Sequence, residues 1–156
     1  MKQLPDNYIG AQLSHATMRQ EDLIPSFMEF IQNVKEKCEI TEQVDSLQEE
    51  VDELEIIEYE GYSGPYYKNP DDANWILHED IWEILMNIAP KFTNFGSHEG
   101  DGSAYGFWTS EESLSEHIRE TIQDLDNDFS FDTNLDLTLV KQELETLVDL
   151  LVAHDY

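Results

Sequence analysis

The stretch FGSHEGDGSAYGFW, residues 95–108, decides the fold class, because it breaks a pattern that is otherwise mostly helical. Two short aromatic runs, KFTNFGS and SAYGFW, are joined there by glycines. Glycine adopts the positive φ angles that tight hairpin turns require. We therefore predict a β-hairpin over about residues 92–108, with an acidic tip that contains Glu99 and Asp101.

The same stretch has two alternative interpretations as a ligand site. Its glycines are spaced G-x-G-x-x-x-G, one residue away from the dinucleotide-binding pattern, and no lysine follows them before position 141, as a phosphate-binding loop would need. Glu99 and Asp101 would also repel a phosphate. His98 beside these carboxylates is compatible with an acid/base pair, but neighbouring residues in a turn do not define a pocket. A hairpin turn is the favoured interpretation.

Five other segments carry the apolar periodicity of amphipathic helices. They cover about residues 20–38, 41–55, 75–89, 110–125 and 135–154. Thr41 is the expected N-cap of the second helix. The third helix ends before Pro90, and its N-cap is one of Asp71, Asp72 and Asn74.

The third helix is expected to bury one apolar face. Its members are Trp75, Ile81, Trp82, Leu85 and Ile88. Residues 55–60 alternate weakly and predict a short strand, whereas residues 66–72 predict a loop. These elements indicate an α+β fold of about five helices packed with a small antiparallel sheet or β-hairpin. Because no repeat or linker is present, we expect residues 1–156 to form a single acidic globular domain.

The composition is that of a folded protein. Of the 156 residues, 40% are hydrophobic and 11% aromatic, which is enough for a core and too much for a disordered acidic tail. The N-terminus lacks a signal-peptide pattern, and no apolar run is long enough to span a membrane, so we expect no membrane partner and a cytoplasmic location. With Cys38 as the only cysteine, the chain forms no internal disulfide.

The charge balance limits the class of partner. The chain carries 35 Asp and Glu against 8 Lys and Arg, a formal net charge of -27. Such a surface repels nucleic acid, anionic membranes and nucleotide phosphates, and it steers basic protein surfaces towards itself. We therefore expect a basic protein as the partner and no direct binding of nucleic acid.

The acidic residues gather in two blocks that contain no lysine or arginine. The first block comprises Glu42, Asp45, Glu49, Glu50, Asp52, Glu53, Glu55, Glu58 and Glu60. The second block includes Asp124, Asp126, Asp128 and Asp132. Solvated helix faces usually mix charges, because each i,i+4 ion pair contributes about 0.2–0.5 kcal/mol, and these blocks lack that contribution.

The spacing of the first block is close to that of phosphates in DNA. Seven acids between positions 42 and 55 lie along 14 residues. As a helix this segment is about 21 Å long, or roughly one charge per 3 Å. Duplex DNA carries about one charge per 3.4 Å on each strand. A protein that binds phosphates through Lys and Arg is therefore a suitable target for this helix.

This composition resembles that of the acidic DNA-mimic inhibitors that phages and mobile elements use against restriction enzymes, CRISPR nucleases and other DNA-binding proteins. The stretches LSHATMRQEDLIPSF and FGSHEGDGSAYGFW are similar to parts of small uncharacterised proteins of bacterial plasmids and phages. The resemblance implies an anti-restriction or anti-CRISPR inhibitor in the cytoplasm of a bacterial host cell. Such an inhibitor occupies the nucleic-acid-binding surface of a host defence protein and blocks DNA binding.

Other classes have weaker support. The segment DLDNDFSFDTNL, which begins at Asp124, resembles a calcium loop, but Phe129 replaces the required Gly and Leu135 the required Glu; loose calcium binding stays open as an alternative. The five histidines form no H-E-x-x-H motif, and no nucleophile motif is present, so we expect no enzyme, no metal and no cofactor.

Three further alternatives stay open. The first is an adaptor protein whose aromatic hairpin makes the partner contacts through Glu99, Asp101, Tyr105 and Trp108. The second is a halophilic origin of the charge. The excess of Glu over Asp and of Lys over Arg makes this origin less attractive. The third is assembly of the chain as a homodimer.

Overall fold

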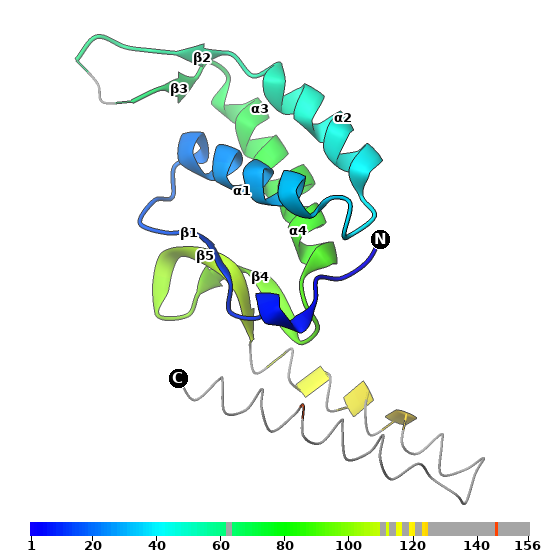
Figure 1. Cartoon of the computed structure of the whole chain (residues 1–156). Helices are drawn as coiled ribbons and strands as arrows, with labels where there is room; N and C mark the ends of the chain where they lie inside the picture. The colour runs from blue at the N-terminus through cyan, green and yellow to red at the C-terminus, as the bar shows by residue number, and fades with distance from the viewer. Residues whose placement is uncertain are drawn as a thin grey trace, which may run out of the picture. The chain divides into compact units, whose positions relative to one another are not determined.

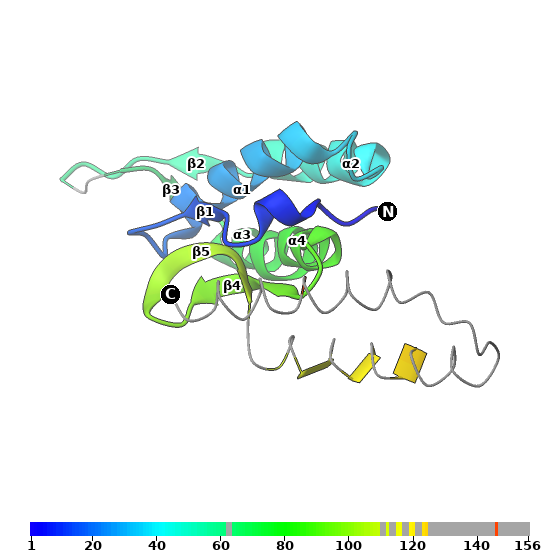
Figure 2. The same cartoon turned by 60° about the horizontal axis from the view of Figure 1, so that its bottom comes forward.

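The computed structural model of the protein describes residues 1–61 and 64–109, together with isolated positions beyond them. The chain divides into two compact units, Met1–Trp108 and Thr109–Tyr156. Figures 1 and 2 show the first unit in two orientations. The helices predicted over 110–125 and 135–154 lie outside the continuously described residues, and the single-domain prediction stays a prediction.

Helix α1, Gln20–Val34, begins at the predicted position, but it ends about four residues before the predicted end at residue 38. The Thr17 hydroxyl donates a 2.6 Å hydrogen bond to Asp22 and accepts one of 3.2 Å from the backbone N–H of Arg19, and these bonds organise the first turn. Acidic side chains in this turn also favour the positive end of the helix dipole. The buried face of the helix consists of Leu23, Ile24, Phe27, Met28, Ile31 and Val34.

Helix α2, Thr41–Asp52, is shorter than predicted. Its N-cap is Ile40, which makes no side-chain cap bond, so the prediction of Thr41 as the cap is wrong by one residue. The helix ends with Glu53 as its C-cap instead of continuing to position 55. Val44 and Leu47 are buried, as the apolar periodicity requires.

Three segments form one continuous helical rod: α3 (Pro70–Trp75), the π-helical turn η2 (Ile76–Ile81) and α4 (Trp82–Ile88). The N-cap is Asn69, whose side-chain oxygen accepts a bond from the N–H of Asp72, and Pro70 fills the first helical position. The prediction of a later cap is therefore wrong. Pro70 and its cap Asn69 begin the helix several residues before Trp75.

The π turn explains an error in the predicted buried face. In an α-helix each residue advances by about 100°, and a π turn advances less, because its hydrogen bonds close five residues apart. The turn therefore keeps Leu77, Ile81 and Leu85 on the side of the core and rotates Trp82 towards the sheet. Trp75 precedes the turn and points away from the core, with 64% of its surface exposed, so the prediction that it is buried is wrong.

The larger sheet has three strands in the order β1-β5-β4, where β1 is Gln12–Ser14, β4 is Thr93–His98 and β5 is Asp101–Thr109. Strands β4 and β5 form the predicted hairpin over the glycine-rich stretch. None of its four glycines has a positive φ angle, so the prediction that they supply positive φ to the turn is wrong. Strand β1 pairs antiparallel with β5, with an irregularity between Gln12 and Ser14. The sequence analysis did not predict β1, since three residues are too few for a recognisable alternation.

A second sheet contains two short antiparallel strands, β2 (Ile56–Ile57) and β3 (Tyr66–Tyr67). Figure 1 shows this hairpin projecting from the helices. Residues 66–72 were expected to form a loop, and this prediction is wrong, because they contain β3 and the start of α3.

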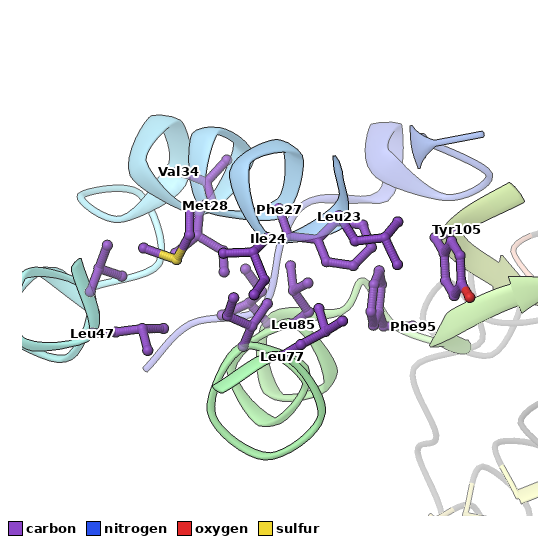
Figure 3. Close-up of a cluster of buried hydrophobic side chains, with 14 of the residues drawn as sticks. Leu23, Ile24, Phe27, Met28, Val34, Leu47, Leu77, Leu85, Phe95 and Tyr105 are labelled. Carbon is purple, nitrogen blue, oxygen red and sulfur yellow. The ribbon is translucent and has the colours of Figure 1, made fainter. Parts of the chain in front are cut away.

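The core lies between α1, α2, the helical rod and the three-stranded sheet, as Figure 3 shows. Phe27 is fully buried in α1 and makes edge contacts with Phe95 at 5.2 Å and Tyr105 at 5.8 Å between ring centroids. Trp82 contacts Phe95 from the rod at 4.7 Å. These four rings join the helices to the sheet.

The α+β class agrees with the structure, but the prediction of about five helices is wrong. The described residues form three helices, namely α1, α2 and the helical rod, together with two small antiparallel sheets of three and two strands. Two of the five predicted helices, 110–125 and 135–154, lie outside the continuously described residues. Strand β2 lies within the strand predicted over 55–60, whereas its partner β3, with two residues, was not predicted.

Candidate protein-binding surface

Helix α2 places its acidic residues opposite its core contacts. With about 100° between successive residues, Glu42, Asp45, Glu49, Glu50, Asp52 and Glu53 occupy an arc of about 160°. Val44 and Leu47 lie on the other side, facing the core. All six acidic side chains are exposed. We call this set the α2 acidic face.

Few cations neutralise the α2 acidic face. The ammonium of Lys35, at the end of α1, lies 2.6 Å from a carboxylate oxygen of Asp45. Asp52 accepts a 2.8 Å hydrogen bond from the Gln48 amide. Within the described residues, no ion pair involves the other four acidic residues of the face, which are Glu42, Glu49, Glu50 and Glu53.

The shorter helix changes the charge spacing only slightly. Five acidic residues lie within the 12 residues of Thr41–Asp52. The helix is about 18 Å long, which corresponds to one charge per roughly 3.6 Å. This value remains close to the value of about 3.4 Å for one DNA strand. The charge spacing therefore stays similar to that of one DNA strand although the helix is shorter than predicted.

The rest of the first acidic block lies on the β2–β3 hairpin. Glu55 forms an ion pair with Lys68, whose N–H donates a 2.8 Å bond to the Glu55 carbonyl. Glu58 and Glu60 are exposed, and within the described residues neither is in an ion pair. Of the residues predicted in the second helix, Glu55 thus lies on the hairpin instead, whereas Glu58 and Glu60 lie outside the helix as predicted.

The second acidic block lies largely outside the described residues. Asp124 is exposed, whereas Asp126, Asp128 and Asp132 are not described. Loose calcium binding at this loop stays an open alternative.

The structure shows further exposed acids that the sequence analysis did not single out. These acids lie on the helical rod and are Asp71, Asp72, Glu79 and Glu83. A signal was present, because no lysine or arginine occurs between Lys68 and Lys91. Asp80 is half-buried beside them, and its pKa is raised by burial and by the nearby carboxylates of Glu83 and Glu79.

The aromatic residues of the β4–β5 hairpin make contacts within the first unit itself. Tyr105 is buried in the core. The indole N–H of Trp108 donates a 2.9 Å hydrogen bond to the carbonyl of Gly96, and its ring contacts that of His98 at 4.8 Å. A partner would reach Tyr105 only if the hairpin opened. The expectation that this hairpin contacts a partner stays a prediction.

The two acids at the hairpin tip are exposed. Asp101 accepts hydrogen bonds from the Ser103 N–H at 3.0 Å and the Ser103 hydroxyl at 2.8 Å. These bonds hold the pKa of the Asp101 carboxyl below its usual range. Glu99 adds a second negative charge at the tip. Asp101 thus fixes the local turn as well as carrying charge.

Among the described residues, no group of three or more His, Cys, Asp and Glu side chains is arranged to hold a metal ion. Cys38 is fully buried, and burial raises the pKa of its thiol. In the part of the chain that the structure describes, no helix is long and apolar enough to cross a membrane.

Comparison of the chain with protein-family models, curated proteins and solved structures finds no match. Function is therefore inferred from the surface of the chain itself. In the unit Met1–Trp108, 22 acidic residues face 6 basic ones, a formal net charge of -16. The first unit alone is thus strongly acidic, and α2 presents a large part of that charge.

Proposed function

We propose that this protein is a DNA-mimic inhibitor that binds the basic nucleic-acid-binding surface of a host defence protein and blocks its access to DNA. The target class comprises restriction nucleases, CRISPR nucleases and other DNA-binding proteins. The observation that carries the proposal is the α2 acidic face, where five of the six exposed acids are in no ion pair within the described residues. This proposal includes a location in the cytoplasm of a bacterial host cell.

The energetics of α2 support this proposal. Asp45, Glu49 and Glu53 follow one another at i,i+4 spacing, where like charges destabilise a helix by about 0.2–0.5 kcal/mol per pair. No basic residue lies in the last turn of α2, where the helix dipole favours cations. The sequence of α2 is therefore poor for stability. A basic partner would relieve this repulsion on binding.

The rigid setting of α2 also supports the proposal. Val44 and Leu47 pack into the core and fix the rotation of the helix, so the acidic face keeps one orientation towards solvent. A preorganised row of charges loses little conformational entropy when a partner binds. A flexible acidic tail of equal charge would lose more.

The proposal predicts salt-sensitive binding that competes with DNA. The test immobilises the full chain, captures proteins from a bacterial lysate at low salt, and elutes them first with duplex DNA and then with salt. We expect DNA to release a DNA-binding protein, which then loses DNA binding when the acidic protein is added back in a gel-shift assay.

Two variants of equal net charge make the test specific. The first carries Glu42→Lys, Glu49→Lys, Glu50→Lys and Glu53→Lys on the α2 acidic face. The control carries Asp6→Lys, Glu29→Lys, Glu36→Lys and Glu99→Lys, which are exposed positions away from α2. The α2 variant should lose the competition and the control should retain most of it. Equal behaviour of the two variants, or captured proteins that DNA does not release, would contradict the proposal.

A further inference from the structure

Trp75 is the most exposed tryptophan of the described residues, and it lies on a rigid element. It ends α3, 64% of its surface is exposed, and the helical rod on both sides of it is anchored in the core by Ala73 and Leu77. Its exposure is not a defect of packing, because the π turn that follows brings Trp82 into contact with the sheet and leaves Trp75 on the opposite side. An indole held outward in this way is typical of an interaction hot spot.

Acidic residues surround this indole along the rod. Asp71, Trp75, Glu79 and Glu83 follow one another at intervals of four residues, and all four side chains are exposed. We call this set the Trp75 stripe. Within the described residues, none of its three carboxylates is in an ion pair. A negatively charged surface around an exposed ring complements a cation with a flat face.

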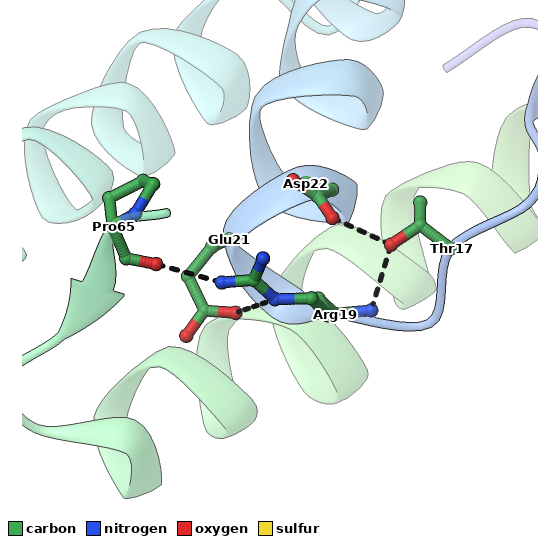
Figure 4. A network of polar contacts seen from close by, with 5 residues as sticks. All are labelled: Thr17, Arg19, Glu21, Asp22 and Pro65. Atoms are coloured by element: carbon green, nitrogen blue, oxygen red, sulfur yellow. Dashed lines mark hydrogen bonds and ion pairs between the residues drawn. The ribbon is translucent and has the colours of Figure 1, made fainter. Parts of the chain in front are cut away.

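The same unit already binds one arginine with this combination of groups. The guanidinium carbon of Arg19 lies 5.1 Å from the centre of the Tyr66 ring, and Arg19 Nε lies 3.7 Å from a carboxylate oxygen of Glu21. Figure 4 shows the polar part of this arrangement. An aromatic face and a carboxylate thus hold a guanidinium together. Trp75 and Glu79 offer these two groups to a guanidinium from outside.

We propose that the Trp75 stripe is a second docking surface, which selects arginine-rich regions of the partner by stacking a guanidinium on Trp75 while Glu79 accepts its N–H groups. Tryptophan is the best aromatic partner for a cation, and the planar guanidinium stacks on a ring where a lysine ammonium does not. This inference rests on the proposed function for the class of partner. The Trp75 stripe would select arginine over lysine, which the α2 acidic face does not do because it presents negative charges without an aromatic ring.

The test uses two probes of equal charge, a nine-residue arginine peptide and a nine-residue lysine peptide, titrated into the full-length protein by calorimetry at low salt. We expect the arginine peptide to bind more tightly to the wild type. Trp75→Ala should weaken the arginine peptide about two- to five-fold, the factor that corresponds to an exposed cation–π contact, and should weaken the lysine peptide less, because an ammonium does not stack on the ring. Trp75→Phe should restore part of the difference.

The matched control is Met86→Ala, which removes another exposed apolar side chain from the same rod outside the stripe and should change neither affinity. Urea unfolding of each variant checks that the fold is retained. Equal loss of both peptides in Trp75→Ala, or no loss of either, would overturn the inference. No loss of either is also the result expected if a second copy of the chain covers the ring, and sedimentation of the wild type and of Trp75→Ala identifies that case.

The outcomes separate the two proposals. If charge reversal on α2 abolishes DNA competition while Trp75→Ala leaves both peptides unchanged, the Trp75 stripe is refuted and the DNA-mimic function stands. If Trp75→Ala removes the arginine preference but DNA does not displace the captured proteins, the stripe binds arginine and the DNA-mimic function is refuted.

Discussion

Arg19 and Pro65, 46 residues apart, are joined by a 2.9 Å hydrogen bond from Nη2 of the guanidinium to the proline carbonyl. Figure 4 shows that this bond links the start of α1 to the residue directly before β3 in the β2–β3 hairpin. The same guanidinium lies over the Tyr66 ring. A hairpin with two paired residues in each strand has little stability of its own. Arg19 is therefore one of the contacts that hold it in place.

Replacing Arg19 should loosen this hairpin. Arg19→Ala is expected to lower the free energy of unfolding by about 1 kcal/mol, since it removes one hydrogen bond and one aromatic contact. The amide of Lys68, which donates to the Glu55 carbonyl at 2.8 Å, should exchange its hydrogen faster. Lys91→Ala removes an equal charge at an exposed position and serves as the control. Unchanged exchange at Lys68 would show that the hairpin stands without Arg19.

Gly106 is required at the pairing of β1 with β5. A Cβ added there would overlap the carbonyl oxygen of Ala11 and lie 2.8 Å from Cζ2 of Trp108. Gly106→Ala should therefore lower the free energy of unfolding by more than about 2 kcal/mol, because the strand must shift. Gly102→Ala is the matched control in the same strand, since a Cβ there meets nothing within 4 Å. Urea unfolding measures both, and equal stability of the two variants would contradict the strand pairing.

Two carboxyls should give opposite pH effects on stability. The raised pKa of Asp80 means that the folded state binds its proton more tightly than the unfolded state, so its charge costs stability at pH 7 and the cost disappears on acidification. The lowered pKa of Asp101 means the reverse: its charge stabilises the fold at pH 7, and this contribution is lost as the pH falls through the lowered pKa.

Thermal melts from pH 7 down to about pH 3, below the ordinary pKa of Asp, measure this difference. Asp80→Asn should raise the melting temperature at pH 7, and Asp101→Asn should lower it. Both differences from the wild type should shrink towards acid pH, because the wild-type carboxyls then become neutral as well. Shifts of the same sign at pH 7 would contradict the burial of Asp80 among Glu79 and Glu83 or the turn formed by Asp101.

The α2 acidic face should trade stability for binding. Glu49→Lys places a cation four residues from both Asp45 and Glu53 and near the negative end of the helix dipole. We expect it to raise the free energy of unfolding by about 0.5–1 kcal/mol at low salt and by less at 1 M salt. The same variant should weaken the salt-sensitive partner binding. Glu49→Gln should have a free energy of unfolding and a partner affinity between those of the wild type and Glu49→Lys. A Glu49→Lys variant less stable than the wild type would refute the charge repulsion in α2.

Local sequence patterns predicted some elements well and others poorly. The apolar spacing of α1 and α2 and the two aromatic runs of the β4–β5 hairpin are local patterns, and these elements begin close to where they were expected, although both helices end earlier than predicted. Strand β2 lies within the predicted strand 55–60, whereas β1 and β3 were not predicted; they have only three and two residues, and β1 exists because the distant strand β5 pairs with it. No local pattern can report such pairing.

The sequence predicted the negative charge of the candidate surface, but not the ion pairs and helix bounds that arrange it. The acids of α2 were identified from the sequence, because they lie in a run of residues that contains no Lys or Arg. The sequence did not show that Lys35 pairs with Asp45 across two helices, or that α2 ends before Glu55. It also predicted Trp75 as a core residue, since its spacing from Trp82 fits an α-helix without a π turn.

The sequence by itself determined that this chain is strongly acidic, that it folds around an apolar core, and that α1, α2 and one glycine hairpin form, because charge, composition and short-range periodicity are local properties. Only the tertiary structure decided which aromatic side chains face solvent. Packing of the rod against α1 and the sheet favours a π turn that buries Ile81 and draws in Trp82, and the same packing leaves Trp75 outside. The exposure of that ring is a result of contacts between distant segments, which no single segment contains.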